Sequence, residues 1–445
     1  MGAPTFSITD GTTTITLNSG SYYTIFYSSS RMEITDPTST WDTGVLTESL
    51  DLMILGGNET QVKAAIRAIE ALVISVFMYH NGGTPVYIQI QYDTDSAPWR
   101  AKLYNASLIT PNIADELWKR QVSANFTFVR DVAWEGAESE IPISAAGQAA
   151  ATGGRSLTFN TTENYISIAA NVIEGTLPAF TRLTFQNTTG DSRYYRKFYV
   201  GNNAFSSPGT FLYSIQGENF TGVGTSTANG NAVGGLVSRI ALPVSPPTTV
   251  NAAYTIPGTT ILNLARGRRF NLLMKSVSGI TDLKARVVLS NSIAFHETFN
   301  LWKSIDLMLQ GGFYFNFGSI PFPPSKNMAY SYRSLYMGIK FWRAGGGNLD
   351  IDYLFLMGTD SFMFAETPGH VIYNNDSLEF DSISGAYTLI ESGERSNAVF
   401  LNTEGFRVFP SVEQRIHVLV DDSSSASILH TASVRLYYRP RRLTI

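Results

Sequence analysis

Two pairs of carboxylates in this sequence have a spacing that could support chemistry. Asp350 and Asp352 stand two residues apart in a predicted strand, so both side chains would face the same side of a sheet. Such a pair could act as the two carboxylates of a glycosidase or hold a cation. Asp93 and Asp95 lie in a predicted turn after a strand, where calcium could bind with help from backbone oxygens. We favour ordinary turn chemistry for the second pair, and for the first a solvated strand face opposite Leu349, Ile351 and Tyr353.

The other residue types that carry enzymatic chemistry are scattered or absent. The chain has no cysteine, which excludes disulfides, thiolate metal sites and cysteine nucleophiles. The sequence contains no Gly-x-Ser-x-Gly nucleophile elbow, no phosphate-binding loop ending in Lys-Ser/Thr and no His-Glu-x-x-His motif. Its histidines show no metal-ligand spacing: His80, His296, His370, His417 and His430. We therefore expect no enzymatic activity, no cofactor, and no catalytic, cofactor-binding or metal-binding residue.

Aromatic and basic residues also form groups that could bind ligands. Several aromatic side chains could form a sugar-stacking platform, although core packing is the interpretation that we favour: Trp302, Tyr314, Tyr330, Tyr332 and Trp342. Two short basic runs are more typical of strand ends than of phosphate binding: Arg266, Arg268 and Arg269, then Arg439, Arg441 and Arg442. The formal charge of −4 is weak, so the composition implies no electrostatic attraction to nucleic acid or to an acidic membrane.

The elements that position these residues are predicted to be mainly β-strands. Charged residues make up only 15% of the 445 residues, and 27 Phe and 22 Tyr accompany abundant Thr, Ser, Asn and Gly. Aromatic and β-branched residues favour strands, and small polar residues favour turns. A chain of this length is expected to form two or three domains. No signal peptide is recognisable, and the longest strongly apolar run, Ala71–Tyr79, is too short to span a bilayer, so we expect no membrane insertion.

One segment has the pattern of an amphipathic helix. Asn58 is a good N-cap residue, and Gln61 stands three residues later, where a capping-box partner belongs. Apolar residues then recur at helical spacing, and a Gly-Gly pair followed by Pro85 ends the pattern. The sequence therefore predicts a helix over Glu59–Tyr79, packed by the face that consists of Val62, Ile66, Ile69, Val73 and Phe77.

Predicted strands surround this helix and continue through the rest of the chain. Period-two alternation in Val86–Tyr92 and Gln121–Arg130 predicts half-buried strands beside the helix. The Ser-, Ala- and Gly-rich stretch 144–154 has no strand or helix period and is predicted to be a linker. Short strands between turn signals over 155–366 predict a β-sandwich, for which a jelly roll is the commonest form. The last stretch, 367–445, is expected to be a C-terminal β segment of four or five strands.

The order of elements in the first third resembles a known family. The segment GVLTESLDLMILGGNETQVKAAIRAIEALV precedes the strand PVYIQIQYD, which is followed by WRAKLYNASLITP and WKRQVSANFTFVRDVAWEG. Over residues 1–143 this order resembles the N-terminal domain of the distal tail and tail-tube proteins of long-tailed bacteriophages. The resemblance implies a tail-tube-like β-sandwich with one flanking α-helix, which assembles into a ring. The region 155–366 resembles, more weakly, the carbohydrate-binding jelly rolls that some distal tail proteins carry.

The composition and the resemblance together predict a structural virion protein of a phage tail, made in the host cytoplasm. We expect it to form a homo-oligomeric ring around the DNA channel, as a distal tail or tail-tube protein with an outward jelly-roll domain. Its partners would be copies of itself, neighbouring tail proteins, DNA as passing cargo and a host surface glycan. One strand–helix–strand signature per chain favours a hexamer over a trimer. The alternatives are a carbohydrate-binding adhesin or receptor-binding tail protein, and a polysaccharide-cleaving enzyme. Neutral polar residues are the candidates to line the channel: Gln89, Gln91, Ser123, Asn125 and Thr127.

Overall fold

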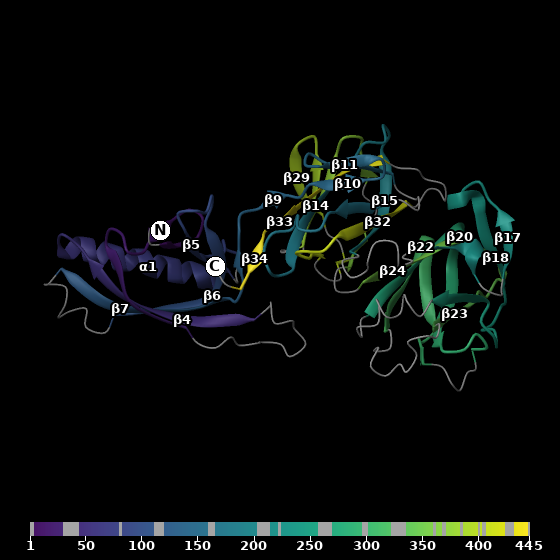
Figure 1. Cartoon of the computed structure of the whole chain (residues 1–445), viewed down its shortest axis with the longest axis horizontal. Coiled ribbons are helices and arrows are strands. Elements are labelled where there is room, and N and C mark those ends of the chain that lie inside the picture. Colours follow the sequence, from purple (N-terminus) through teal and green to yellow (C-terminus); the bar gives the residue numbers. More distant parts are fainter. Residues whose placement is uncertain are drawn as a thin grey trace. The chain divides into compact units, whose positions relative to one another are not determined.

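The protein is mainly β, and it divides into two compact units. The computed structural model describes residues 4–29, 44–79, 82–110, 120–158, 165–202, 214–220, 224–256, 269–295, 301–321, 335–358, 362–366, 371–382, 386–398, 401–402, 406–422 and 431–443. Within these ranges α1 is the only α-helix (Figure 1). Unit 1 comprises Met1–Ser139, Glu174–Pro178 and Arg439–Ile445, and unit 2 comprises Glu140–Ile173 and Ala179–Tyr438.

Unit 1 is built on a sheet of nine strands whose main path runs β2-β1-β5-β6-β7-β4-β3. Neighbouring strands are antiparallel, and the C-terminal strand β34 joins the sheet through β8. The elements of this unit are β1 (Thr5–Thr9), β2 (Thr14–Thr16), β3 (Tyr22–Ser29), β4 (Val45–Leu55), α1 (Glu59–Tyr79), β5 (Tyr87–Gln91), β6 (Trp99–Ile109), β7 (Gln121–Asp131), β8 (Trp134–Glu135) and β34 (Arg441–Arg442).

Helix α1 has the bounds and the N-terminal cap that the sequence predicts, which confirms both expectations. The Asn58 side chain accepts a hydrogen bond from the backbone N–H of Gln61 at 2.9 Å. The Gln61 side chain in turn accepts one from the backbone N–H of Gly57 at 2.7 Å. These bonds satisfy backbone donors that have no partner within the helix, and they fix the position of its first turn.

The buried face of α1 packs on the apolar side of the sheet. Val62, Ile66 and Ile69 belong to the same core cluster as the inward residues of the central strands. The predicted face is wrong at its C-terminal end, because Phe77 is 51% exposed whereas Val76 is 1% exposed. Successive helical residues are about 100° apart, so Val76 and Phe77 flank the apolar stripe on opposite sides. A small rotation of the helix end therefore decides which of the two is buried.

Unit 2 contains a β-sandwich of two eight-stranded sheets with a shared core. One sheet runs β11-β10-β13-β32-β15-β25-β30 and the other β12-β33-β14-β27-β28-β29. Phe185 of one sheet and Phe198 of the other have ring centroids 5.7 Å apart in the core between them. The strands are β9 (Ser139–Glu140), which spans the boundary between the units, β10 (Ile143–Ala145), β11 (Gln148–Ala151), β12 (Arg155–Thr158), β13 (Tyr165–Ile168), β14 (Ala179–Asn187), β15 (Arg193–Asn202), β25 (Phe362–Glu366), β26 (Val371–Ile372), β27 (Ser377–Asp381), β28 (Ala386–Glu391), β29 (Glu394–Ala398), β30 (Leu401–Asn402), β31 (Arg407–Val408), β32 (Gln414–Asp422) and β33 (Thr431–Tyr438).

A further sheet of unit 2, which we call the inserted sheet, lies in sequence between β15 and β25 and is coloured teal to green in Figure 1. The first part of its long strand β20 pairs with β24 and the last part pairs with β23, so one strand serves two segments of the sheet. Its elements are β16 (Ser214–Gln216), η2 (Gly217–Asn219), β17 (Thr225–Ala228), η3 (Val233–Gly235), β18 (Leu236–Leu242), β19 (Ala252–Ile256), β20 (Arg269–Ser290), β21 (Trp302–Lys303), β22 (Leu307–Pro321), β23 (Leu335–Trp342) and β24 (Gly347–Gly358).

The segment 144–154, expected to be a linker without strands, contains β11 and most of β10. These two strands form a hairpin around Gly147, whose φ of 70° suits a turn. The sheets also cross the expected division between 155–366 and 367–445, because β14 pairs with β27 and β33. The strands of the sandwich thus come from both sides of the inserted sheet in the sequence.

Candidate functional site

Four polar side chains form a hydrogen-bonded network on one side of the sheet of unit 1. We call Ser49, Asp51, Asn125 and Thr127 the polar strand face. Asn125 Nδ2 donates to Ser49 Oγ at 2.8 Å and to Asp51 Oδ1 at 2.7 Å. Thr127 Oγ1 donates to Asn125 Oδ1 at 2.9 Å and lies 3.2 Å from Ser49 Oγ. The network therefore joins strands β4 and β7 through their side chains as well as through their backbones.

The polar strand face follows from the two-residue period of β4 and β7. In the register of these strands Ser49 stands opposite Thr127, and Asp51 stands opposite Asn125. The alternate residues, among them Leu50 and Leu52 of β4 and Phe126 and Phe128 of β7, are buried in the core on the other side. Asp51 is the only ionisable residue of the four, so this surface is neutral to negative and has no cation to hold phosphate.

The glutamines predicted to share this role lie in a different electrostatic setting. Gln89 of β5 stands opposite Arg100 of β6, and its side chain accepts a hydrogen bond from Ser7 Oγ at 3.2 Å. The neighbouring outward residue of β6 is Lys102, whose Nζ lies 3.8 Å from the ring centroid of Tyr79. The β5–β6 part of the sheet thus carries Arg100 opposite Gln89 and Lys102 opposite Tyr87, whereas Gln91 Nε2 donates to the Asp95 carbonyl at 3.3 Å. Among the predicted lining residues, Asn125 and Thr127 belong to the polar strand face, and Ser123 lies exposed on the same strand.

A buried ion pair lies in unit 1 toward one end of the same two strands, β4 and β7. Both nitrogens of the Arg130 guanidinium edge, Nε and Nη2, donate to the Glu48 carboxylate at 2.8 Å. The side chains are 5% and 3% exposed, and the guanidinium carbon lies 4.4 Å from the ring centroid of Trp134. The sequence contained a signal for this pair, since both residues occupy inward positions in strands whose other inward residues are apolar.

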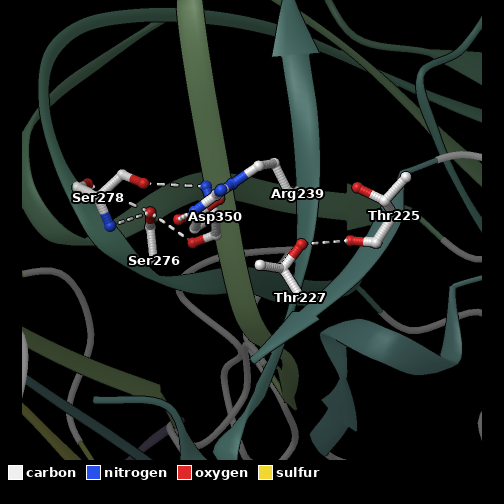
Figure 2. A network of polar contacts seen from close by, with 6 residues as sticks. All are labelled: Thr225, Thr227, Arg239, Ser276, Ser278 and Asp350. Carbon is white, nitrogen blue, oxygen red and sulfur yellow. Dashed lines mark hydrogen bonds and ion pairs between the residues drawn. The ribbon is translucent and has the colours of Figure 1, made fainter. Parts of the chain in front are cut away.

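Asp350 is held by two different parts of the inserted sheet, as Figure 2 shows. Its carboxylate accepts two hydrogen bonds from Arg239, from Nε and from Nη2, each at 2.7 Å. These bonds, and then the charge of Asp350, raise the pKa of Arg239. The Asp350 backbone donates to Ser278 Oγ at 2.9 Å and accepts from Ser276 Oγ at 2.9 Å. The expected solvated strand face is therefore wrong at this position, because Asp350 is 7% exposed and fully engaged in a bidentate ion pair.

Asp352 departs further from that expectation, because it is completely buried. Its carboxylate lies 2.8 Å from the ammonium group of Lys275, and its other oxygen accepts a hydrogen bond from the Val233 N–H at 3.0 Å. Burial raises the pKa of Asp352, and the charge of Lys275 opposes that effect. The two aspartates thus pair with separate cations. A shared role as a glycosidase pair receives no support from this geometry.

The remaining candidate residues for chemistry have structural settings. Asp95 accepts a hydrogen bond from the Tyr92 N–H at 3.2 Å within a turn, as expected of ordinary turn chemistry. His417 is buried, and burial together with nearby Arg415 lowers its pKa to about 3. The other four histidines lie outside the described residues. Within the described ranges, no group of three or more His, Asp or Glu side chains could hold a metal ion.

The sugar-stacking platform, the alternative to core packing, receives no support from the rings that the structure describes as buried. Tyr314 and Trp342 are 1% and 4% exposed, while Tyr330 and Tyr332 lie outside the described residues. Core packing, the interpretation that we favoured, explains the two buried rings. In the second basic run, Arg441 and Arg442 form β34, in agreement with a strand end. Of the helices in the described part of the chain, none combines the length and apolar character needed to cross a membrane.

Comparisons with known proteins give distant likenesses only. No protein-family model matches the chain, and no curated protein matches it either. Among solved structures, the chain is similar to one of the phage P2 baseplate in its activated conformation with Ca, with 10% identity and a TM-score of 0.29 over 99% of this chain and 98% of that one. A structure of the same baseplate with Sr has 10% identity and a TM-score of 0.25 over 98% of each chain. A structure of infectious bursal disease virus, Gx strain, has 10% identity and a TM-score of 0.16 over 69% of this chain and 80% of that chain. TM-scores this low carry no argument about fold or function.

Proposed function

We propose that this protein is a structural virion protein of a bacteriophage tail whose unit 1 assembles into a ring around the DNA channel. The observation that carries this proposal is the polar strand face. On one side of β4 and β7, this face forms a hydrogen-bonded polar network without a cation. The other side is an apolar core covered by α1. A sheet with these two sides is suited to border a channel with its polar wall, since lysines and arginines would hold DNA phosphates and slow its passage.

Ring formation uses the edges of the sheet. Within the described residues, the main path of the sheet ends at β2 and β3, so one edge of each strand has no neighbour there. Edge strands present unpaired backbone groups that can pair with another chain. Contacts between unlike edges close a ring when the rotation between subunits divides the circle. Within the described residues the chain has one sheet covered by a helix, in unit 1, and one such copy per chain supports a hexamer; the second unit would be an outward addition. Neighbouring tail proteins would stack on the same ring.

The experiment is a comparison of assembly between two variants that place a lysine on an exposed isoleucine. Ile25, in edge strand β3, is 57% exposed, and Ile305, in unit 2, is 79% exposed. Because both positions are solvent-exposed, neither substitution buries a charge, and both variants are expected to fold. Sedimentation velocity over a range of protein concentrations should show that Ile25→Lys weakens assembly while Ile305→Lys assembles as the parent does. Equal assembly of all three proteins would show that β3 is not part of the subunit contact. Weaker assembly of Ile305→Lys alone would move the contact to unit 2.

A further inference from the structure

Unit 2 contains a small buried cluster that belongs to neither of its two large cores. Its members are at most 1% exposed, and we call them the joint: Tyr199, Leu273, Tyr314, Tyr353, Phe355 and Leu419. Two of them come from strands β15 and β32 of the sandwich, and the other four come from strands β20, β22 and β24 of the inserted sheet. The cluster thus joins two sheets that the chain connects only after Asn202 and after Gly358.

Strand alternation shows that the joint lies on the outer face of both sheets. Phe198 and Val200, on either side of Tyr199, are in the sandwich core. In the inserted sheet, Leu354 and Leu356, on either side of Phe355, are in the other large core. Because successive strand residues point to opposite faces, Tyr199 and Phe355 point away from those cores and toward each other's sheet. Both outer faces are therefore apolar where they meet.

Two of the tyrosines of the joint are paired through their hydroxyls. The hydroxyls of Tyr314 and Tyr353 are 2.6 Å apart, and the rings of Tyr199 and Tyr314 have centroids 6.2 Å apart. Beside them lies the ion pair of Lys275 and Asp352, whose side chains are 2% and 0% exposed. A register shift makes Lys275 pair with Tyr353 and Ser276 pair with Ile351, so Asp352 is an extra residue in β24. A β-bulge of this kind re-aims a side chain, here the carboxylate toward Lys275.

His417 extends the same contact without adding a charge. Its ring lies between Tyr165 of the sandwich, at 5.4 Å, and Phe355 of the inserted sheet, at 5.7 Å. Burial and then Arg415 lower the pKa of His417, so the ring is neutral near neutral pH. Aromatic anchors of this kind, desolvated and packed at the centre of a contact, carry most of the binding energy of protein interfaces.

We propose that the joint locks the inserted sheet to the sandwich in one orientation, so that unit 2 moves as a single rigid body. The aromatic rings supply the attraction, because they bury large apolar surfaces with little conformational freedom to lose. The ion pair of Lys275 in β20 and Asp352 in β24 lies within the inserted sheet, so it stays paired in any docking on the sandwich. It holds the bulge of β24 beside Tyr353, since losing one partner would leave the other charge buried alone. This inference is independent of ring formation by unit 1.

Pairs of spin labels test the joint directly, because a chain without cysteine accepts two engineered ones without interference. We would place them at two exposed positions, Arg435 in β33 and Ile305 before β22, and measure the distance distribution by pulsed electron resonance. The labelled parent should give one narrow peak. Tyr199→Ala removes the sandwich anchor and should cause loss of that single peak. Tyr387→Ala is the matched control, since this tyrosine is 4% exposed in the sandwich core and should destabilise the protein without broadening the peak.

Two further variants guard against misfolding and test whether the aromatic rings alone hold the joint. Leu419→Ala replaces Tyr199→Ala if the latter does not fold, and it should also broaden the peak. The double variant Lys275→Met with Asp352→Leu keeps the joint apolar and leaves the aromatic contact with the sandwich in place, so it should keep the single narrow peak of the parent. A broad distribution in the parent, or a narrow peak in both anchor variants, would overturn the rigid joint. A broad distribution in the double variant would overturn the assignment of the attraction to the aromatic rings.

Discussion

The buried pair of Glu48 and Arg130 allows a quantitative test of how unit 1 holds its register. Glu48→Leu removes the carboxylate that accepts two hydrogen bonds from a guanidinium that is 5% exposed. Removing one partner of a buried ion pair costs about 3–5 kcal/mol, because the other charge stays buried. We expect a value near the lower limit. Arg130 Nη1 still donates to the Asp131 carbonyl at 2.7 Å, and the guanidinium still lies over the Trp134 ring.

The double variant Glu48→Leu with Arg130→Met separates the interaction from the burial of either residue. Both replacements are apolar, so the pair position becomes part of the core, and we expect the double variant to lose no more than about 1 kcal/mol. The coupling energy in the double-mutant cycle should then exceed about 2 kcal/mol. Lys63→Met is the control, since its ion pair with Glu59 on α1 is 47% and 56% exposed and should change stability only slightly.

Native-state hydrogen exchange followed by mass spectrometry reports on unit 1 in the full chain. Peptides that cover β4 and β7 give the free energy of local opening for these strands. The single variant should speed exchange there, and the double variant should restore most of the protection. Single variants that each cost less than about 1 kcal/mol would refute the reasoning. A double variant whose loss equals the sum of the two single losses would refute it as well.

Three further predictions concern unit 1. Ile69→Asp places a charge at a position of 0% exposure and should abolish folding. The control Phe77→Asp, at 51% exposure, should give soluble protein with the parent circular dichroism spectrum. Soluble, assembling Ile69→Asp protein would contradict the packing of α1. Asn58→Ala removes the side chain that caps the Gln61 N–H and should lower the stability of α1 by about 1 kcal/mol. Peptides from the first turns of α1 should then exchange faster, and an unchanged exchange rate would contradict this prediction. Burial raises the pKa of Asp131 to about 6, above the ordinary value of 3.8, so the folded state holds its proton more tightly than the unfolded state and stability falls as pH rises from about 4 to about 6. Asp131→Asn should therefore remove part of this dependence when denaturation midpoints are compared across that range; parallel pH profiles for the two proteins would show that Asp131 does not titrate there.

Helix α1 shows which features of this fold can be predicted from sequence. Its start depends on neighbouring residues, since Asn58 and Gln61 cap it locally, and its apolar period is carried by consecutive turns. The same pattern did not determine which residue near the C-terminal end faces the core. Val76 is buried and Phe77 is exposed because the position of the sheet beneath that turn decides between them, and the sheet is assembled from strands distant in sequence.

Asp352 shows what the sequence alone could not reveal. The two-residue period correctly separates Asp350 from its apolar neighbours, but alternation alone does not show whether a polar residue at an outward position is solvated or buried. Lys275 and the bulge that turns Asp352 toward it become visible only when β20 and β24 are paired. The Ala- and Gly-rich stretch 144–154 is a similar case. It lacks a hydrophobic pattern, and pairing of β10 with β11 and β13 makes part of it a strand all the same.

The polar strand face was partly predictable for the same reason. Asn125 and Thr127 could be assigned to one side of a strand from alternation alone. Their network with Ser49 and Asp51 depends on the register between β4 and β7. That register also explains why Gln89 differs from them, since its neighbour across the strand pair is Arg100. The chemistry of a strand face depends on its neighbouring strands, and these come from other parts of the chain.

The most direct test of the proposed function is to determine the assembled state of the full chain by native mass spectrometry together with electron microscopy of the same sample. The proposal predicts a closed ring of six copies whose channel is bordered by the β4–β7 sheet, with Asn125 and Thr127 facing the lumen. A protein that stays monomeric at high concentration, a ring of three copies, or a lumen lined by Arg100 and Lys102 would contradict it.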